Sequence, residues 1–489
     1  MGCSVRAAHP VNAISDLKAV SVADLNTNDH RWVLGYRSAG DGGGGLFRYN
    51  AGSSVADDAG LTIAPNTGAG RWERVWKRGC LDVKWFGASG AGSDTAANDQ
   101  SAFAHAIAAA NRLGASVYIP AGNYYVTGPF TITNGAVVIF GDTVGGTTIH
   151  HTESNTLFNH AANEFYAVRG FQHMKIVGNS GVSAKGIVLS NTFHAFCRDL
   201  LIRDYTGGVG IQLINTNSLW TEGTHIESVH IRNCAKCVEF AVSGGTNSFS
   251  ETRIYHTSIV PEAANQTGIV IGDGCYVYAG VFDFKLFPSA NSSTCVGMSL
   301  GSNASLGDTF LNIFIEFAAE ATTAVGISTV ASSNITCPGN VYPPIGDVRH
   351  SINALSSVFI GTNARYGDSR ITGGEVANWS GSDNTATLGA VAVSDPSGGY
   401  SYGGYGFAHG NNIETPVAWG YAGAPSIFEV FKVGFQQRLS AGMCLMKVSP
   451  IGDLELTQNG QGVVVRSPNG TRYRISVNDA GMVVATAAP

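Results

Sequence analysis

The sequence predicts an all-β chain whose middle part is a parallel β-solenoid. The first support is a repeat between residues 171 and 317, in which an apolar residue is followed six times by partners three and five positions later. Successive repeats begin 26 to 29 residues apart, and a second strand-like stretch follows each of them. One coil of this length cannot bury its own inner face, so neighbouring coils must stack.

The inward-facing positions of the six repeats are apolar with Thr257 as the one polar exception. They are Phe171, Met174 and Ile176; Cys197, Leu200 and Ile202; Ile226, Val229 and Ile231; Ile254, Thr257 and Ile259; Val281, Phe284 and Leu286; and Phe310, Ile313 and Ile315. Outward side chains of stacked coils form columns with a spacing of ~4.8 Å, which suits an extended polymer as the ligand.

The composition also favours a β-rich fold, and it excludes several functions. Glycine is abundant (63 residues), only 13% of residues are charged, and the net charge of −6 comes with no basic run, which argues against a nucleic-acid partner. No apolar stretch reaches the ~18 residues of a membrane span, and the first twenty residues lack the layout of a signal peptide. We therefore expect a soluble protein that is not inserted into a membrane and not exported by the general secretory route.

Cysteine and histidine usage indicates no cofactor and no metal site. The nine cysteines are scattered, and the single close pair, Cys234 and Cys237, has no second pair or suitably spaced histidines beside it. We expect buried structural thiols. His150, His151 and His160 lack convergent acids, and we expect them on the surface.

Taken in order, the chain divides into three regions. Residues 1–79 form a Gly-rich head, in which the glycines after Asp41 favour a turn between short strands over a phosphate site, because no helix follows them. Residues 80–345 form the solenoid. It starts with a helix over 97–113, which is capped by Asp94 or Asn98, stopped by Gly114 and placed to cover the first coil. Residues 346–489 are β-rich and lose the repeat.

Several of these segments resemble a known family. Residues 83–94, the alanine-rich helix and residues 117–124 resemble the opening of pectate-lyase-like right-handed β-helices. The head, with its run after Ala39 and its Gly70-Arg71-Trp72, is similar to the head domain of phage tailspike depolymerases, and residues 460–477 look like a C-terminal hairpin of phage tail proteins. The resemblance covers most of the chain except about residues 345–440.

The resemblance implies more than the residues themselves do. It implies a right-handed β-helix, and a homotrimer joined through a C-terminal trimerisation region. It implies a head that attaches to phage tail or baseplate proteins, and a location in the virion tail. The implied substrate is a bacterial surface polysaccharide, which is a capsule, an O-antigen or an exopolysaccharide.

The repeat supplies a register for finding outward side chains. Counting two positions after each start gives the column His173, Asp199, Ser228, His256, Asp283, Asn312. Counting four gives Lys175, Leu201, His230, Ser258, Lys285, Phe314, and counting six gives Val177, Arg203, Arg232, Val260, Phe287, Glu316. This register places Asp283 one coil from His256, and it predicts a bulge near Glu227, where the alternation slips.

Two sets of acids compete for the catalytic role. One set is Glu227 and Asp283 with His256. The other is Glu222, which follows Trp220, and Glu251 one coil later; these two either stack or face opposite ways. The predicted catalytic residues are therefore Glu222, Glu227, Glu251, Asp283 and His256, and the predicted substrate-binding residues are Trp220, His230, Arg232, Tyr255 and Lys285.

Three functions fit this surface. Hydrolysis of a glycosidic bond needs two carboxyls, which neighbouring or alternate coils can supply. A lyase would use His256, Lys285 or a tyrosine as the base, with Arg232 neutralising a uronate. A third possibility is a non-catalytic fibre that binds glycan. We expect the hydrolase, because a net charge of −6 suits an acidic substrate poorly.

Overall fold

The computed structural model describes residues 9–318 except 24, 78, 162–168 and 218, then 321, 324–328 and 333–342, several short strands between 352 and 456, and residues 463–487. The chain divides into two compact units, one of residues 1–356 with 365–370 and the other of 357–364 with 371–489. The predicted domain limits at 79/80 and 345/346 stay predictions.

The head is a small β-sheet with its own core. Its strands lie in the order β1-β2-β3-β5-β4. The elements are β1 (His9–Val11), α1 (Ile14–Ala19), β2 (His30–Val33), β3 (Gly45–Asn50), β4 (Thr62–Ile63) and β5 (Arg71–Arg74). Leu17, Phe47 and Trp72 are buried in its centre. The Gly-rich run joins the antiparallel strands β2 and β3, which confirms the predicted turn.

The Asp41 carboxylate holds that turn. It accepts hydrogen bonds from the backbone N–H groups of Tyr36, Arg37, Ser38 and Gly43 at 2.7–3.1 Å. Burial by itself raises the pKa of Asp41, but the four donors outweigh it and the pKa lies below its usual value.

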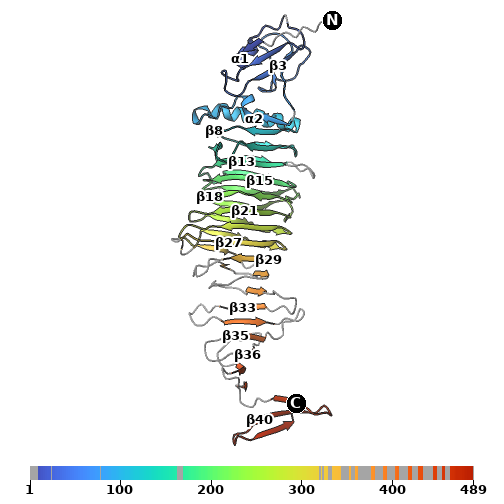
Figure 1. The fold of residues 1–489 in the computed structure, drawn as a ribbon, viewed down its shortest axis with the longest axis vertical. Helices are drawn as coiled ribbons and strands as arrows, with labels where there is room; N and C mark the ends of the chain where they lie inside the picture. Colours follow the sequence, from blue (N-terminus) through green and yellow to red (C-terminus); the bar gives the residue numbers. More distant parts are fainter. Residues whose placement is uncertain are drawn as a thin grey trace. The chain divides into compact units, whose positions relative to one another are not determined.

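The predicted helix caps the first coil. It is α2 (Ala96–Leu113), preceded by β6 (Cys80–Asp82) and two short 3-10 turns, η1 (Val83–Phe86) and η2 (Ser93–Thr95). Figure 1 shows α2 lying across β8 (Gly122–Val126). Phe103 is buried there, with its ring 5.5 Å from that of Tyr124, and Gly114 ends the helix at φ 64° as predicted.

The predicted helix caps are wrong. Thr95 is the N-cap residue and forms no side-chain cap, Asp94 lies in η2, and Asn98 is inside the helix. The carboxylate that holds this end is Asp99, which accepts hydrogen bonds from the backbone N–H groups of Ser89 and Gly90. The preceding loop folds back onto the first turn, so a residue within the helix holds that loop in place.

The solenoid is built from stacked parallel strands (Figure 1). The first sheet contains β6, β7 (Ser116–Ile119), β10 (Val138–Gly141), β13 (Arg169–Val177), β15 (Ala195–Arg203), β17 (His225–Glu227), β21 (Arg253–Val260), β24 (Val281–Leu286), β27 (Phe310–Ile315) and β29 (Asn334–Tyr342), with β8, β11 (Thr147–His151) and β18 (His230–Arg232) extending it sideways. The second contains β9 (Phe130–Ile132), β12 (Thr156–His160), β14 (Lys185–Ser190), β16 (Val209–Thr216), β19 (Lys236–Ser243), β22 (Thr267–Ile271), β25 (Val296–Leu300), β28 (Val325–Ser328) and β30 (Ile352–Asn353). Short strands β20 (Ser248–Ser250), β23 (Tyr276–Tyr278) and β26 (Ser305–Gly307) complete the later coils.

The predicted fold class is thereby confirmed as a parallel β-solenoid behind a small N-terminal β domain. Inward residues of successive coils meet directly, as Ile226 does with Ile254 and Ile254 with Phe282. All three are fully buried. The stacked inner faces thus form one continuous apolar core.

The first sheet carries a bulge that most of its coils share. His173, Asp199, Ser228 and His256 have φ values of 48–60°, in the left-handed region, and we call these four residues the bulge column. Strands β24 and β27 contain no such residue, and the pairing of β21 with β24 shifts register between Tyr255 and Thr257. The last two repeats are therefore one residue shorter at this point, and their equivalent inward residues are Phe282 and Leu311.

The cysteine prediction is confirmed where the structure describes the side chains, and the histidine prediction is mostly wrong. Cys197, Cys234, Cys237, Cys275 and Cys295 are buried and unbridged, and Cys80 is half-buried. His151 and His160 are also buried, at 2% and 0% exposure, because they find polar partners inside. His151 hydrogen bonds to Asn155, and His160 to the Val137 carbonyl. Burial lowers the pKa of His160 to about 4.

The second unit contains three groups of strands. They are β31 (Val358–Gly361), β32 (Val376–Trp379), β33 (Gly389–Val393) and β34 (Tyr402–Gly406); β35 (Val417–Gly420), β36 (Phe428–Lys432), β37 (Cys444–Val448) and β38 (Leu454–Leu456); and β39 (Val463–Arg466), β40 (Arg472–Val477) and β41 (Val483–Ala487). The last three form an antiparallel sheet. Most of the predicted trimerisation region lies outside the described residues.

Among the residues that the structure describes, no helix has the length and apolar character needed to span a bilayer.

Candidate functional site

One outward column of the first sheet carries most of the chemistry. The Cα pairings of β13, β15, β17, β21, β24 and β27 align, in order, Gln172, Arg198, Glu227, Tyr255, Asp283 and Asn312. We call these six residues the wall column. Each directly follows a buried apolar residue of its strand, and each is one rung of ~4.8 Å from the next.

The predicted second-position column is a mixture of two columns. His173, Asp199, Ser228 and His256 belong to the bulge column, whereas Asp283 and Asn312 belong to the wall column. The neighbour of Asp283 on the preceding coil is therefore Tyr255, and the prediction that it is His256 is wrong. Successive side chains of a strand face opposite ways, and the last two repeats lack the bulge residue. Counting two positions from each repeat start therefore reaches the bulge column in the first four repeats and the wall column in the last two.

The prediction of a bulge near Glu227 is confirmed, because the bulge residue is the next one, Ser228. His256 sits at the bulge of the following coil, with an exposed side chain whose ring centroid is 5.6 Å from that of Tyr255. It borders the wall column without belonging to it.

Glu227 is the acid with the most polar contacts in the wall column. Its Oε2 accepts a hydrogen bond from Arg198 Nε at 2.7 Å, and its side chain is 25% exposed. Partial burial raises the pKa of Glu227, but hydrogen bonds from Arg198 and Tyr255 pull the pKa below its usual value. Glu227 is therefore ionised at neutral pH.

Tyr255 and His225 complete the surroundings of Glu227. Burial and the hydrogen bond to Glu227 raise the pKa of Tyr255, so its phenol keeps its proton. The His225 ring packs edge-on against Tyr255 at 6.1 Å, and burial followed by the charge of Arg253 lowers the pKa of His225. A neutral hydroxyl and a neutral imidazole thus lie beside one carboxylate.

Asp283 lies two rungs from Glu227, with Tyr255 between them. Its Oδ1 accepts a hydrogen bond from Asn312 Nδ2 at 2.7 Å. Two rungs place the Cα atoms of Glu227 and Asp283 roughly 9.6 Å apart. Carboxyl pairs that hydrolyse glycosides with inversion are about 6.5–9.5 Å apart, and retaining pairs about 5–5.5 Å. The spacing fits the inverting arrangement better.

Glu222 and Glu251 lie on the strand and bend that precede this sheet. Glu222 is level with Ser250, and Gly223 with Glu251, because the Gly223 N–H bonds to the Ser250 carbonyl. The two acids are thus offset by one position and do not stack. Glu222 Oε1 accepts a hydrogen bond from Ser248 Oγ at 2.9 Å, whereas Glu251 is exposed at the bend with φ 56°.

Trp220 lies beside Glu222 in the sequence and packs away from the wall column. Its ring meets Phe193 edge-on, with the centroids 5.9 Å apart. The structure therefore separates the Trp220 and Glu222 pair from the Glu227 and Asp283 pair.

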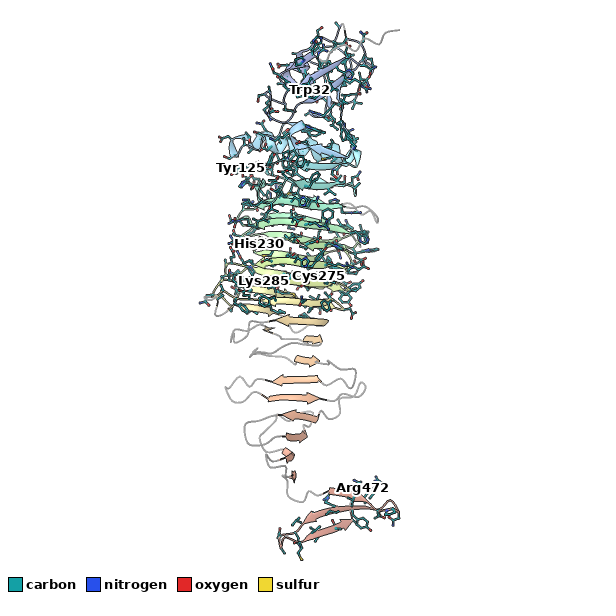
Figure 2. The ribbon with its side chains drawn as sticks, viewed as in Figure 1. Trp32, Tyr125, His230, Cys275, Lys285 and Arg472 are labelled. Atoms are coloured by element: carbon teal, nitrogen blue, oxygen red, sulfur yellow. The ribbon has the colours of Figure 1, made fainter. Side chains whose placement is uncertain are left out.

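The predicted fourth-position column is confirmed. The strand pairings align Leu201, His230, Ser258, Lys285 and Phe314. Figure 2 labels His230 and Lys285, which lie two coils apart in this column. Burial, followed by the charge of Arg232, lowers the pKa of His230.

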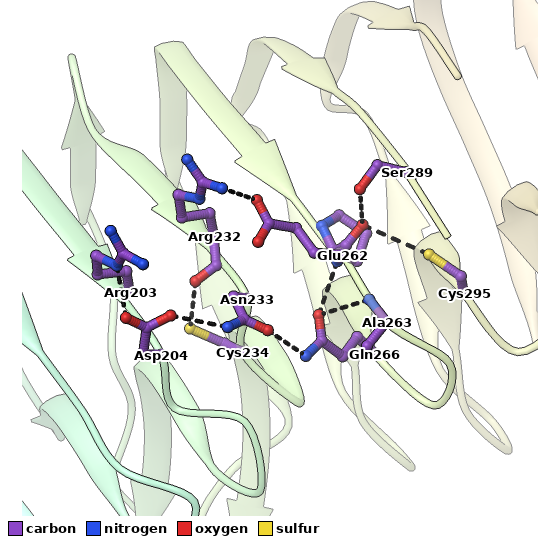
Figure 3. A network of polar contacts seen from close by, with 11 residues as sticks. Arg203, Asp204, Arg232, Asn233, Cys234, Glu262, Ala263, Gln266, Ser289 and Cys295 are labelled. Carbon is purple, nitrogen blue, oxygen red and sulfur yellow. Dashed lines mark hydrogen bonds and ion pairs between the residues drawn. The ribbon is translucent and has the colours of Figure 1, made fainter. Parts of the chain in front are cut away.

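The cations predicted to bind substrate already have acidic partners. Arg232 Nη2 lies 2.6 Å from Glu262 Oε1, and Lys285 forms an ion pair with Glu316. Figure 3 shows Arg232 and Glu262 beside a chain of hydrogen bonds from Asp204 through Asn233 to Gln266, which ties three successive coils together. The charge of Arg232 therefore balances a carboxylate of its own chain.

Sequence reasoning missed two members of the site, Arg198 and His225. Arg198 lies on β15, one coil before Glu227, and His225 lies on β17 with Glu227. Counting one position after each repeat start would have found Arg198, and counting one position before it would have found His225. Within the described part of the chain, no cluster of three or more histidine, cysteine and acidic side chains is arranged to hold a metal ion.

Coils of parallel strands, closed by a helix and carrying a polar outward wall, define a parallel β-solenoid. Residues 81–169 match the family model described as rhamnogalacturonase A/epimerase, pectate lyase-like. Residues 10–77 match the model of the phage tail protein small four-stranded β-sheet domain. The head thus resembles a phage tail β domain and the start of the solenoid resembles pectate-lyase-like proteins, and the resemblance found in the sequence is confirmed at this level. No curated protein sequence matches the chain.

Solved phage tailspikes share the fold. The enzymatically active domain of tailspike protein 4 of bacteriophage CBA120 is 13% identical, with a TM-score of 0.51 over 81% of this chain and 64% of that one. This chain therefore spans less than two thirds of that domain. Tailspike protein gp49 of the Acinetobacter baumannii bacteriophage Fri1, a capsular polysaccharide depolymerase, is 11% identical over 85% and 94% of the two chains, with a TM-score of 0.48.

A bacterial protein is also similar. The Pantoea stewartii WceF protein, a glycan biofilm modifying enzyme with a bacteriophage tailspike-like parallel β-helix fold, is 14% identical over 98% and 82% of the two chains, with a TM-score of 0.45. At these identities the likeness concerns the fold alone.

Proposed function

We propose that this chain is a phage tailspike that binds a bacterial surface polysaccharide and depolymerises it by hydrolysing glycosidic bonds within the polymer. The observation that carries the proposal is the wall column, in which Glu227 and Asp283 flank Tyr255 on an outward face. The phage tail β domain at residues 10–77 and the tailspike fold support the same assignment.

The proposal gives the two acids different roles. Glu227 is held ionised by Arg198, so it is suited to take a proton from water as that water attacks the anomeric carbon. Asp283, two rungs away with its Oδ1 accepting a hydrogen bond from Asn312 Nδ2, is the second carboxyl of the pair and would act as the general acid toward the leaving glycosidic oxygen. One water is consumed, its hydroxyl goes to the anomeric carbon, and the new chain end receives the proton of Asp283.

The contacts of the cations favour hydrolysis over elimination. A lyase needs a cation to neutralise the uronate and a base to remove a proton. Arg232 and Lys285 are paired with Glu262 and Glu316, and the pKa of Tyr255 is raised by burial and by Glu227, so less of its phenol is deprotonated and available as a base. The pectate-lyase-like match of residues 81–169 keeps elimination as the alternative outcome of the test.

The assembly proposed with this function is a homotrimer in the virion tail. The region beyond residue 345 would join the three chains, and the head would attach to tail or baseplate proteins. Sedimentation of the full chain at three times its mass of 50.9 kDa is the expected result, and a monomer at all concentrations would contradict the trimer.

A polysaccharide panel tests the activity. The full chain is incubated with purified capsular, O-antigen and exopolysaccharides, and the products are analysed for reducing ends and for the ultraviolet absorbance of an unsaturated uronate. Reducing ends without that absorbance are expected, with inversion at the anomeric carbon by NMR. Absorbance would establish the lyase, and binding without shortening would establish a non-catalytic fibre.

Matched variants then test the residues. Glu227→Gln and Asp283→Asn each preserve shape, and each is expected to lose at least about 100-fold in kcat while still binding polymer. Glu222→Gln and Glu251→Gln are the matched controls, and we expect both to remain active. Full activity in the first two variants, or loss only in the controls, would refute the assignment of Glu227 and Asp283.

A further inference from the structure

The wall column continues from Gln172 towards the capping helix. Gln172 pairs with Phe140 of β10, and Phe140 pairs with Tyr118 of β7. Both aromatic residues lie on the outward side of strands whose inward residues, Val117 and Ile139, are buried. The same column that holds Glu227 and Asp283 thus contains two adjacent aromatic rings before it reaches Asp82 of β6.

We propose that Tyr118 and Phe140 form a distal subsite on which a sugar ring of the bound polysaccharide stacks. This inference rests on the proposed function. It adds the location of a site that holds the polymer at a distance from the cleaved bond. Pyranose rings present a face of C–H groups, and a flat, partly exposed aromatic ring is complementary to that face. The ligand class is therefore a neutral or weakly charged pyranose of the polymer chain.

The two rings are held in a fixed arrangement. Their centroids are 5.3 Å apart and their planes are inclined by 31°. The Tyr118 hydroxyl donates a hydrogen bond to Asp142 Oδ1 at 3.1 Å, which fixes the position of the ring. Both side chains are half-buried, so each ring packs on one side and remains open on another. A site of this kind loses little conformational entropy when it binds.

The spacing agrees with a polymer that follows the column. Phe140 is three rungs from Glu227 and Tyr118 is four, which corresponds to roughly 14 and 19 Å. A sugar unit of an extended polysaccharide advances by about the height of one rung. The subsite would therefore hold the third or fourth sugar from the cleaved bond. Gln172 and Arg198 lie between and present amide and guanidinium groups to the hydroxyls of the intervening sugars.

The inference predicts a dependence on substrate length. Oligosaccharides too short to reach Phe140 should be cleaved equally by the wild type and by a Tyr118→Leu/Phe140→Leu double variant. For longer ones, we expect the double variant to show a KM raised by about tenfold with an unchanged kcat. Leucine keeps apolar volume at both positions but removes the flat faces. The single variant Tyr118→Phe keeps both aromatic rings and should have a KM close to that of the wild type.

The control is Tyr125→Leu. Tyr125 lies in the adjoining strand β8 with its ring stacked on His150 at 4.2 Å, in a different outward column. Its variant should match the wild type at every substrate length. The inference fails if the double variant keeps the wild-type KM on long substrates, or if Tyr125→Leu raises the KM equally; the depolymerase activity would stand in both cases. If the wild type cleaves no polysaccharide, the proposed function fails and this inference fails with it.

Discussion

Thr257 is the one polar residue in the inward positions of the six repeats, and replacing it with valine would restore the apolar pattern. The structure predicts that Thr257→Val nonetheless destabilises the protein. Thr257 is 3% exposed, and its hydroxyl donates to the Tyr255 carbonyl at 3.0 Å and lies 3.4 Å from the Ile226 carbonyl. It spans the bulge at His256, where the pairing with the next coil shifts register.

The expected loss is about 1 kcal/mol. Exchanging the hydroxyl for a methyl group gains at most about 0.8 kcal/mol from apolar burial. Removing the donor from buried carbonyls costs about 1–3 kcal/mol, and the lower half of that range applies here because the Tyr255 carbonyl keeps a hydrogen bond from the Ser228 N–H at 3.2 Å. The cost therefore exceeds the gain, and Thr257→Val should unfold at a lower urea concentration than the wild type.

Thr257→Ser separates the two effects. Serine keeps the hydroxyl and loses only the methyl group, so amide hydrogen exchange around Tyr255 should stay slow in the serine variant and become faster in the valine variant. Urea unfolding followed by tryptophan fluorescence measures the stability of each. A valine variant as stable as the wild type, with unchanged exchange around Tyr255, would show that the hydroxyl does not hold the bulge.

Three further predictions concern other residues described above. Phe282→Ala should cost about 3–5 kcal/mol in urea unfolding, whereas Phe310→Ala, on a residue 48% exposed, should change stability by no more than about 0.5 kcal/mol; equal losses would contradict the register of β24 and β27. Arg198→Met should raise the pKa of Glu227 and move the acidic limb of the kcat/KM profile to higher pH, and an unmoved limb would rule out Glu227 as the titrating base. Asp41→Asn should destabilise the head in thermal unfolding near neutral pH. Because the folded pKa of Asp41 is depressed, its contribution is complete above the unfolded value of about 3.8 and is lost as the pH falls through the folded value, so the difference between variant and wild type should vanish in strong acid.

The apolar repeat was sufficient to predict the solenoid and one whole outward column, and the stretch at 97–113 was sufficient to predict the capping helix. The column from Leu201 through His230 to Phe314 could be predicted because it lies after the bulge, where all repeats have the same length. The column that holds Glu227 and Asp283 lies before or at the bulge. A spacing of three between apolar residues does not show whether the extra residue lies in a bulge or in a strand, so His256 and Asp283 were assigned to one column.

The remaining misses come from partners that are distant in the sequence. The burial of His160 could not be predicted because its hydrogen-bond partner, the Val137 carbonyl, is 23 positions earlier in the chain and becomes its neighbour only in the folded coils. The sequence does not show whether Arg232 is free to bind a ligand, because its partner Glu262, 2.6 Å away, is 30 positions later in the chain. The sequence pattern predicts whether a strand residue faces inward or outward. It does not predict which loops contact each other, because those contacts form only when the coils stack.

The bulge column also bears on how such a surface can change. Coils with and without the extra residue stack directly on each other, and the same apolar core continues through both. A gene that gains or loses one codon at this bend would thus alter which side chain reaches the ligand while the folding of the coil is preserved. Under the proposed function, specificity for a new glycan would arise through single-codon length changes in a coil, which leave its neighbours intact.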